Sequence, residues 1–459
     1  MVFREYNLVF NHLVVDYELV RFVILEMFLR KLSLFFWMID IRLVREKPDL
    51  FLKCYKFMKK SELVEAFNEL VVKDKKLREI KVELDQLRSS RNILSEEINK
   101  LKKAGKDISI VLKKVKSLPE EIKQLEEEYN SVEIRISELM LILPNLIHEK
   151  VPYGESDKDN VQIKKFGKVP KFDFPVKNHV EILENLGLVD FDASAKVIGN
   201  GFYYLKGDLA LLNQALIRFT IDYMTEKGYE YVEPPLMLKK EILMGAIDKN
   251  VFENSVYQIE GQNAALIGTS EFAILGMHAN EIITLPKKYF SYSMCFRQEI
   301  GAHGINEKGL WRTHQFNKVE QFIFCSKEQS WKFYDELLKN TEGIFQALEL
   351  PYRVIEICTG DLAVWKARSA DVEVWRPTLN AYGEVASLSN CTDYQARNLN
   401  IRYEDKEGRE VVHTLNNTAL ATSRAMVAII ENNQQKDGTV LIPKMLWKYM
   451  GGKKVLKKA

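Results

Sequence analysis

The chain has few of the residues that build metal or disulfide frameworks. Its 459 residues include only five cysteines, Cys54, Cys295, Cys325, Cys358 and Cys391, and no two of them form a Cys-x-x-Cys pair. This spacing argues against a zinc ribbon and against the disulfide framework of a small secreted protein. A reducing cytoplasm is the simplest location for such a chain.

A long hydrophobic run is also missing. Residues 1–37 are rich in Leu, Val and Phe, yet charged residues from Arg4 to Lys31 interrupt every candidate span. A membrane helix needs about 20 mostly apolar residues, and neither a signal peptide nor a transit peptide has this pattern. We therefore expect no membrane partner. Because the composition changes at Met38, we expect Met38 to be the native initiator and residues 1–37 to be a translated upstream extension.

Glycine-rich phosphate loops are absent too. The sequence contains neither Gly-x-Gly-x-x-Gly nor Gly-x-x-x-x-Gly-Lys, so a Rossmann or P-loop nucleotide site is unsupported. Any nucleotide must then be held by side chains on a sheet. The net charge is only +2, from 66 basic and 64 acidic residues. Affinity for nucleic acid would therefore have to come from local patches.

What the chain does have, from Ser61 to Leu143, is the pattern of a helical hairpin. The return arm repeats apolar residues at steps of three and four from Ile108 to Leu143, and the outgoing arm has two leucine series offset by three residues. These are heptad seams with a local overwinding. Residues 104–107 make the turn, and an outgoing helix of roughly 40 residues would be about 60 Å long. Pro119 is expected to kink or break the return arm.

Charge is uneven along this hairpin. Residues 73–116 hold 14 basic and 7 acidic residues, a net of +7, whereas residues 117–143 hold 2 and 7, a net of −5. One interpretation is the solvated surface of an ordinary coiled coil. The other is an arm that lies on a polyphosphate backbone. Because the arm is poor in aromatic residues, such contact would be to shape and phosphate more than to stacked bases.

The remainder of the chain predicts an α+β fold. Residues 144–177, with several prolines and glycines, are expected to be a polar linker between one domain at 38–143 and a second domain at 178–459. Strand-like segments then alternate irregularly with helices, which favours a mixed or mainly antiparallel sheet. The expected helices span residues 208–227, 326–348 and 419–432.

One stretch, from Met294 to Phe324, has too many charges for a core hairpin. Arg297, Glu299, Arg312, Gln315 and Glu320 alternate with Phe296, Trp311, Phe316, Val319 and Phe322 around a glycine-rich loop. Such alternation is typical of a solvated sheet face, but paired or ligand-bound charges would also explain it. The loop, residues 301–309, is interpreted as a mobile flap.

The wording of this stretch resembles a known family. FRQE followed by LWRTHQFNKVEQF is similar to the second signature motif of class II aminoacyl-tRNA synthetases, in the form that seryl-tRNA synthetases have. Other blocks match in order: GYEYVEPP at 228–235 resembles motif one, GTSE at 268–271 the serine-recognition loop, and TSRAMVAIIENNQQ at 422–435 motif three. TGDL at 359–362, EVW at 373–375 and EVASLSNCTDYQAR at 384–397 resemble further family blocks. The resemblance runs from Met38 to about Met450. It implies a class II antiparallel sheet flanked by helices, with an N-terminal coiled-coil arm.

The resemblance also implies how ATP is bound. Arg297 and Arg424 would be the catalytic residues, with Arg297 on the α-phosphate and the serine carboxylate, where bidentate geometry favours Arg. Glu299 would accept a hydrogen bond from the adenine amino group, and Phe316 would sandwich the ring with Arg424. The implied ATP-binding set is Arg297, Gln298, Glu299, Arg312, Thr313, Phe316, Glu384, Val385, Ala386, Ser387 and Arg424.

Two of these residues would also serve a metal ion. Glu384 and Ser387 would hold Mg²⁺ with ATP through oxygen, which suits a hard cation that keeps several waters. Arg312 would reach the terminal phosphate. Members of the common type of the family use no zinc, and no zinc is expected here.

The serine site implied by the resemblance consists of carboxylate and hydroxyl groups. It comprises Thr269, Ser270, Glu271, Arg297, Glu320 and Thr418. Such a site rejects alanine, because its buried polar groups would lose a partner. Two plainer interpretations stay open: Thr418 as a helix cap and Ser387 as an ordinary strand residue. The three histidines His179, His303 and His314 are given no catalytic role.

The predicted activity is that of a serine–tRNA ligase with ATP, L-serine and tRNA(Ser) as partners, acting as a homodimer through motif one, where Pro234 and Pro235 lie. The arm would hold the tRNA. The alternative is a synthetase-like paralogue that binds RNA or charges a carrier protein. The chain departs from the family pattern at Ala370, Arg376 and Asn416-Asn417, which leaves the local shape open.

Overall fold

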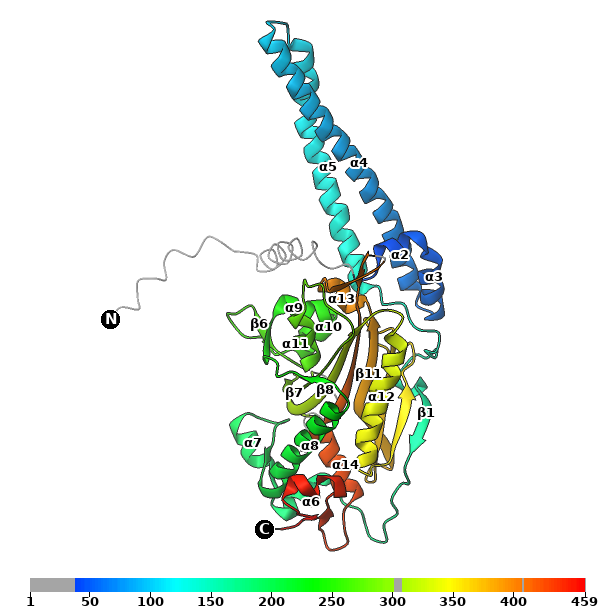
Figure 1. Cartoon of the computed structure of the whole chain (residues 1–459), viewed down its shortest axis with the longest axis vertical. Coiled ribbons are helices and arrows are strands. Elements are labelled where there is room, and N and C mark those ends of the chain that lie inside the picture. Colours follow the sequence, from blue (N-terminus) through cyan, green and yellow to red (C-terminus); the bar gives the residue numbers. More distant parts are fainter. Residues whose placement is uncertain (1–37, 301–307, 407, 459) are drawn as a thin grey trace, which may run out of the picture. The chain divides into compact units, whose positions relative to one another are not determined.

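The computed structural model describes residues 38–300, 308–406 and 408–458 (Figure 1). The expected upstream extension, residues 1–37, and most of the glycine-rich loop, residues 301–307, lie outside the described residues. The chain divides into two compact units. The described part of the first comprises residues 38–52 and 60–143, and the second comprises residues 53–59 and 144–458.

The first unit is helical. Short helices α2 (Ile41–Glu46) and α3 (Pro48–Phe57), whose last residues fall in the second unit, precede the two long helices α4 (Ser61–Lys103) and α5 (Ser109–Ile142). The predicted outgoing helix is confirmed and has 43 residues. The turn between α4 and α5 contains Gly105 with a φ of 65°, a left-handed conformation that glycine adopts without strain.

The seam of this hairpin follows the predicted heptads. Leu70, Leu77 and Leu84 of α4 are buried, and the predicted return series from Ile108 to Leu143 has no exposed member. The second leucine series, at Leu87, Leu94 and Leu101, is only partly buried. Ion pairs join the helices on the outside of the seam, at Arg88–Glu126 (2.8 Å), Arg135–Glu69 (2.8 Å) and Lys76–Glu128.

The predicted break at Pro119 is wrong. Helix α5 continues through Pro119 from Ser109 to Ile142. Proline removes one i→i−4 hydrogen bond and strains its helix by about 3 kcal/mol, but neighbouring Leu118 and Ile122 are buried in the seam. Packing of the seam holds the helix together where the local sequence favours a restart.

The second unit is built on one eight-stranded sheet, in the order β1-β9-β10-β11-β14-β8-β7-β4. All neighbours are antiparallel except β4 and β7, which confirms the predicted mainly antiparallel sheet. The strands are β1 (Val161–Phe166), β9 (Tyr352–Glu356), β10 (Arg368–Arg376), β11 (Ala381–Thr392), β14 (His413–Ala421), β8 (Gln315–Cys325), β7 (Lys287–Phe296) and β4 (Glu230–Tyr231).

Three long helices lie near their predicted positions: α8 (Gly207–Glu226), α12 (Ser330–Ala347) and α14 (Thr422–Asn432). The expected start of the last helix at residue 419 is wrong, because β14 continues to Ala421. The other elements are η1 (Asp157–Asp159), α6 (His179–Leu186), β2 (Val189–Asp190), α7 (Phe191–Val197), β3 (Tyr204–Leu205), β5 (Met237–Lys239), α9 (Lys240–Ala246), α10 (Lys249–Ser255), β6 (Ala264–Leu266), α11 (Ser270–Met277), α13 (Tyr394–Asn398), β12 (Arg402–Asp405), β13 (Gly408–Val411), β15 (Val440–Leu441), η2 (Lys444–Met450) and β16 (Val455–Leu456). Within the described part of the chain, no helix combines the length and hydrophobicity needed to cross a membrane.

Part of the segment expected to be a linker belongs to the sheet. Strand β1 pairs with β9 at the edge, from Val161 opposite Glu356 to Phe166 opposite Tyr352. Every side chain of β1 is exposed, so it lacks the buried alternation that marks a strand in sequence. Residues 144–177 are therefore only partly a connection.

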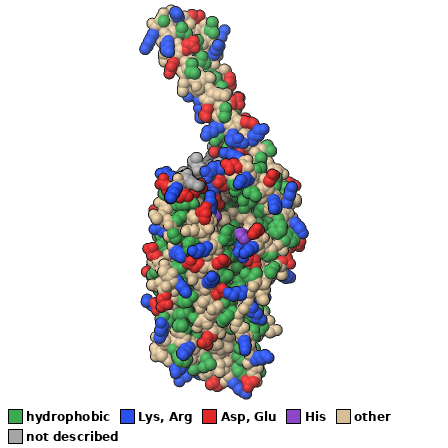
Figure 2. Space-filling model, turned by 45° about the vertical axis from the view of Figure 1, so that its right-hand side comes forward, with side chains coloured by type: hydrophobic (Ala, Val, Ile, Leu, Met, Phe, Trp, Pro, Cys, Tyr) green, Lys and Arg blue, Asp and Glu red, His purple; other side chains and the backbone are tan. Residues whose placement is uncertain are grey.

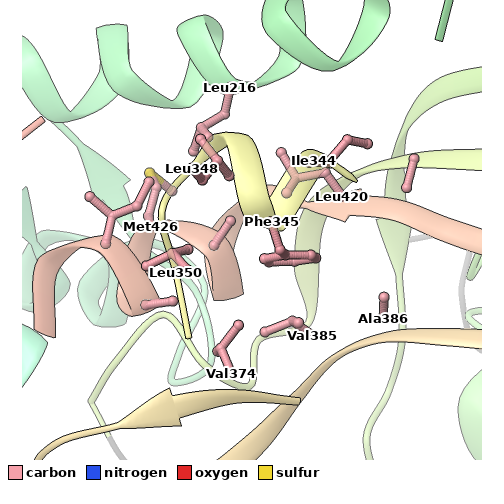
Figure 3. Close-up of a cluster of buried hydrophobic side chains, with 14 of the residues drawn as sticks. Leu216, Ile344, Phe345, Leu348, Leu350, Val374, Val385, Ala386, Leu420 and Met426 are labelled. Atoms are coloured by element: carbon pink, nitrogen blue, oxygen red, sulfur yellow. The ribbon is translucent and has the colours of Figure 1, made fainter. Parts of the chain in front are cut away.

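Hydrophobic cores form on both faces of the sheet. The larger packs α8, α12 and α14 against one face, with Phe345 at 0% exposure near Val385 and Leu420 (Figure 3). The smaller joins α9, α11 and α13 to the other face through Phe322 and Phe324. The sheet is thus covered on both sides, which is what a rigid base for a binding site requires.

We expect the larger core to be sensitive to single truncations. Phe345→Ala should lower the free energy of unfolding by about 3–5 kcal/mol, because it removes a fully buried ring and leaves a cavity. Lys339→Ala on the exposed side of the same helix is the matched control and should change it by less than about 0.5 kcal/mol. Urea denaturation followed by circular dichroism measures both, and equal losses would contradict the assigned orientation of α12.

Candidate active site

A cavity of about 430 Å³ opens in the second unit. Its walls come from α10, the start of α11, the connection between β7 and β8, the first half of β8, parts of β11 and β14, the first turn of α14 and residues 363–366. All the predicted site residues line this cavity except Gln298 and Ser270. The side chain of Gln298 instead donates to the carbonyl of Val256 (2.9 Å), and Ser270 is fully buried.

Strand β8 supplies the floor of the cavity with alternate side chains. Phe316, Lys318 and Glu320 line the cavity, whereas Val319 and Ile323 pack in the larger core. The predicted alternation is therefore partly wrong: Glu320 shares its face with Phe316 and Phe322, and Val319 lies on the other. The predicted hairpin is also shorter than expected. Arg297, Glu299 and Arg312 lie in the connection between β7 and β8.

A cluster of buried charges lies at one end. Lys318 Nζ lies 2.7 Å from Glu320 Oε2, and the two side chains are 7% and 2% exposed. Thr418 donates its hydroxyl hydrogen to the same oxygen (3.2 Å). Glu271 accepts from Gln395 Nε2 (2.7 Å). Burial, together with the negative charge of Glu320, raises the pKa of Glu271 to about 7.

Thr269 and Thr418 lie next to these carboxylates. Thr269 is the N-cap of α11, where its hydroxyl accepts from the N–H of Glu271 (3.3 Å), and it lines the cavity. Thr418 is a residue of β14 rather than a helix cap, so that plainer interpretation is wrong. The result is a small polar compartment of two carboxylates, one ammonium and two hydroxyl groups.

A second compartment surrounds the end of β7. Arg297 donates from Nε to the carbonyl of Gly268 (3.1 Å), and its guanidinium lies 5.3 Å from the centre of the Phe316 ring. Arg312 pairs with Glu299 at 2.6 Å. Glu299 has a φ of 50°, a conformation that non-glycine residues adopt rarely and that concentrates at functional sites.

The third group of residues gathers around Trp311. Arg424 donates from Nη1 to the carbonyl oxygen of Glu384 (2.8 Å) and lies 3.2 Å from its carboxylate. It also donates from Nε to the carbonyl of Trp311 (3.3 Å), with its guanidinium 5.5 Å from the ring centre. Arg424 and Phe316 both line the cavity, but the cation that lies over Phe316 is Arg297.

The oxygen atoms of β10 and β11 fit a hard cation. Glu384 and Ser387 line the cavity, and Ser387 lies opposite Asp371 in the β10–β11 register. Asp371 Oδ1 is buried with no hydrogen-bond partner in the protein. Burial and the charge of Glu384 raise the pKa of Asp371 to about 7. Burial also acts to raise the pKa of Glu384, but Arg424 overcomes this and lowers it. Carboxylate and hydroxyl oxygens of this kind suit Mg²⁺, although no group of three acidic, His or Cys side chains among the described residues could hold a metal.

Several cavity residues were missed from the sequence. Lys318, Lys366, Trp311 and Asn416 all line it. Lys318 could have been found, since it stands two residues before Glu320 in a strand and so shares its face. Two residues that depart from the family pattern lie on opposite sides of β14. Asn416 faces the cavity, whereas Asn417 donates to the Leu337 carbonyl and the Thr341 hydroxyl on the other side.

Of the histidines that were given no role, two lie beside the site. His314 Nδ1 lies 3.0 Å from the carbonyl of Arg297, and its ring lies 5.2 Å from that of Phe202. His179 is buried against Glu431 (2.9 Å). His303 lies outside the described residues.

Comparison with known proteins gives the same outline. Residues 253–433 match the family model of the class II tRNA synthetase core domain (G, H, P, S and T), and residues 38–147 match that of the seryl-tRNA synthetase N-terminal domain. A serine–tRNA ligase of Methanocella arvoryzae is 46% identical over 421 residues, covering 90% of this chain and 99% of the relative. That of Nitrosopumilus maritimus is 42% identical and covers 91% and 100%.

Solved structures agree with these relatives. The seryl-tRNA synthetase of Pyrococcus horikoshii, complexed with ATP, has a TM-score of 0.86 at 40% identity and covers 92% of this chain and 100% of its own. The cytoplasmic serine–tRNA ligase of Naegleria fowleri, in complex with AMP, has a TM-score of 0.80 at 32% identity and covers 90% and 96%. This chain therefore belongs to the seryl-tRNA synthetase family, the serine–tRNA ligases among the class II synthetases.

Proposed function

We propose that this chain activates serine with ATP and transfers the seryl group to the 3′ end of tRNA(Ser). In the first step an oxygen of the serine carboxylate attacks the α-phosphorus of ATP, the bond to the β-phosphate oxygen breaks, and pyrophosphate leaves. In the second step a ribose hydroxyl of the tRNA attacks the seryl carbonyl carbon and AMP leaves. The observation that carries the proposal is the cavity, which gathers residues from the GTSE block, from motif two, from the block at 384–397 and from motif three.

ATP would occupy the compartments around Arg297 and Trp311. Arg297, on the α-phosphate, would neutralise the charge that develops during attack, because a preorganised cation in a partly dry site acts strongly. Arg312 would meet the terminal phosphate, and Glu299 the adenine amino group, so ATP would have to separate or share their 2.6 Å ion pair. Arg424 would stack on the adenine. Gln298, Val385 and Ala386 would contribute through their backbone, since their side chains point elsewhere.

Mg²⁺ would be held with ATP by Glu384 and Ser387, where it would neutralise phosphate charge and align the leaving group. Asp371 supplies further negative charge behind Ser387. The buried unpartnered oxygen of Asp371 and the oxygen donors of β11 support this assignment.

Serine would occupy the compartment between α11, β8 and β14. Its ammonium group is balanced by the carboxylates of Glu271 and Glu320, which exceed the single ammonium of Lys318 by one charge. Its hydroxyl group would meet the polar atoms of Thr269 and Glu271, which line the cavity. Alanine has no hydroxyl group, so these buried groups would be left without a hydrogen-bond partner when alanine is bound. The free-energy cost of leaving them unpaired favours serine over alanine.

The remaining partners are argued from the other elements. The sheet ends at β4, which belongs to motif one and pairs only with β7 among the described strands, and its free edge supports a homodimer with Pro234 and Pro235 near the interface. Five free cysteines, all within the described residues, support a cytoplasmic location. The alternative of a non-aminoacylating paralogue predicts the loss of Arg297, Glu320 or Arg424, and all three line the cavity.

The arm of α4 and α5 would hold the tRNA. Its distal half is the basic part of the sequence, and Lys and Arg side chains lie among acidic ones at its tip in Figure 2. Each phosphate that a Lys or Arg neutralises adds to a salt-sensitive affinity. Lys308, beside the undescribed loop, pairs with Asp192 at 2.7 Å.

The overall proposal is tested by amino-acid-dependent exchange between ATP and pyrophosphate. Serine should support exchange at least 10³-fold better, in kcat/KM, than alanine or glycine, on the scale expected when buried polar groups need a substrate hydroxyl. Threonine has the hydroxyl and is excluded by the size of its extra methyl group. Aminoacylation of tRNA(Ser) with serine completes the assay. Exchange that is equal for alanine would sink the assignment of the serine compartment.

Removing residues 73–116 should separate the two steps. Serine-dependent exchange should stay within about threefold of the intact chain, because the cavity lies wholly in the second unit, whereas transfer to tRNA should be lost.

A finer variant replaces Lys102, Lys103 and Lys106 by Ala and should reduce the salt dependence of tRNA binding by up to about three phosphate contacts. Glu120→Gln and Glu121→Gln in the acidic part are the controls. Equal loss of exchange and transfer would contradict this division.

Glu271→Gln should make the protein more stable and less active. In the folded state the pKa of Glu271 is raised to about 7 from an ordinary 4.5, so wild-type stability falls as the pH rises from 4.5 to 7. The free energy of unfolding of the variant should therefore equal that of wild type at pH 4 and exceed it by about 3 kcal/mol at pH 8. KM for serine should rise at least tenfold. Thermal unfolding at both pH values measures the difference in stability between the variant and wild type. A variant that is less stable than wild type at pH 8 would contradict the raised pKa of Glu271.

A further inference from the structure

A buried polar network lies behind the cavity and contains no residue to which a role has been given. His179, at the start of α6, packs against Glu431 near the end of α14. Arg376, at the end of β10, forms two hydrogen bonds to the same carboxylate, at 2.8 and 2.7 Å. The exposed fractions of the side chains are 8% for His179, 0% for Glu431 and 7% for Arg376. Arg376 is also one of the departures from the family pattern.

The hydrogen bonds fix which nitrogen of His179 carries the proton. The backbone N–H of Leu310 donates to Nε2 of His179 (3.1 Å), so Nε2 is an acceptor without hydrogen. Nδ1 then carries the proton and donates to Glu431 Oε1 at 2.9 Å. Glu431 can only accept: burial acts to raise its pKa, but the hydrogen bonds from Arg376 and His179 lower it to about 2. The imidazole is thus held in one tautomer and one orientation.

Leu310, whose backbone N–H binds His179, directly precedes two residues that line the cavity. Leu310 is fully buried, and the next two residues, Trp311 and Arg312, both line the cavity. The residue before it, Gly309, has a φ of 156°, and a Cβ there would lie 2.9 Å from His179 Nε2. Side chain and backbone therefore meet too closely for any other residue at 309.

The same network reaches the cavity by a second route. The guanidinium of Arg376 lies 4.2 Å from the centre of the Trp311 ring. A Cβ on Gly383 would lie 2.6 Å from Trp311 Cζ2, so the ring is packed tightly against β11. The carbonyl of Trp311 in turn accepts from Nε of Arg424 (3.3 Å). The network thus holds the ring of Trp311 through Arg376 and the backbone one residue earlier through His179.

We propose that His179 is a positioning residue for the ATP compartment: locked by Glu431 and Arg376, its Nε2 holds Leu310 and so sets where Trp311 and Arg312 enter the cavity. An ordinary buried histidine only satisfies its own polar atoms. In His179 the bond from Nδ1 to Glu431 fixes the ring, and the bond at Nε2 holds the segment that carries ATP-binding residues. This inference rests on the proposed function only in taking Arg312 and Arg424 as residues that bind ATP.

The two hydrogen bonds can be removed one at a time. An Asn side chain brings its amide to the position of Nδ1, whereas a Gln side chain reaches the position of Nε2. His179→Asn should keep the bond to Glu431 and leave the Leu310 N–H buried without a partner. His179→Gln should keep an acceptor for Leu310 and lose the bond to Glu431. Each variant loses one buried hydrogen bond, so each is the stability control for the other.

The expected result is a split in substrate dependence. In serine-dependent exchange, His179→Asn should raise KM for ATP at least tenfold and leave KM for serine within twofold of wild type. His179→Gln should keep KM for ATP within about threefold, although its melting temperature falls as far as that of His179→Asn. A purely structural role predicts that both variants follow their melting temperatures with no split between ATP and serine, and that result would overturn the proposal.

A second variant leaves the histidine intact. Glu431→Gln can donate to Nδ1, which allows the other tautomer and turns an Nε2–H toward the Leu310 N–H. It should therefore copy His179→Asn. Isothermal titration of each protein with ATP alone reads the same effect without catalysis. If wild type binds ATP but shows no serine-dependent exchange, the proposed function fails while the ATP titrations still test His179. If His179→Asn and Glu431→Gln bind ATP as wild type does, the inference fails alone.

Discussion

The chemistry of the cavity depends on the buried ion pair between Lys318 and Glu320. Both residues stand on β8, between β7 and β14, where an unpaired charge would be expelled or neutralised. The pair lets a carboxylate remain in the middle of a sheet at 2% exposure. Glu271, which is hydrogen-bonded by the neutral side chain of Gln395 instead, has its pKa raised. Because Lys318 pairs with Glu320 alone, Glu271 has no ion-pair partner among the described residues, and this suits the ammonium group of an amino acid substrate.

The sheet makes this arrangement rigid because β8 is covered on both faces. Val319 and Ile323 are fixed in the core with α8 and α12, so Lys318 and Glu320, on either side of Val319 in the strand, point into the cavity. The same logic extends to Trp311, which is held between β11 and the charged network behind it. Functional side chains on such supports keep their positions without help from the ligand.

Sequence reasoning found the parts of this protein that follow a period or a motif. The leucine seam, the mainly antiparallel sheet and the family blocks could all be predicted from the sequence. The motif residues Arg297, Glu320, Thr418 and Arg424 lie around one cavity. It failed where tertiary packing overrides local preference. Pro119 stays within α5 because the seam is buried around it, and β1 joins the sheet although all its side chains are exposed. It also missed His179, because the backbone group that this side chain contacts lies 131 residues away in the chain. Lys318 was overlooked although its place two residues before Glu320 in the same strand made it predictable.

The arm differs between its root and its tip. At the root, Asp74 lies at 2% exposure in the seam, clamped by Arg45 (2.6 Å) and Arg78 (3.1 Å), and such a buried polar group fixes the register of a coiled coil. Toward the turn the leucines of α4 are only partly buried, and Gly105 ends the helix. Amide hydrogens should accordingly exchange through local opening at the tip and only through global unfolding at the root. The hairpin is therefore rigid near Asp74 and more flexible near its turn. The flexible end is the one that would adapt to the curved phosphate backbone of a tRNA.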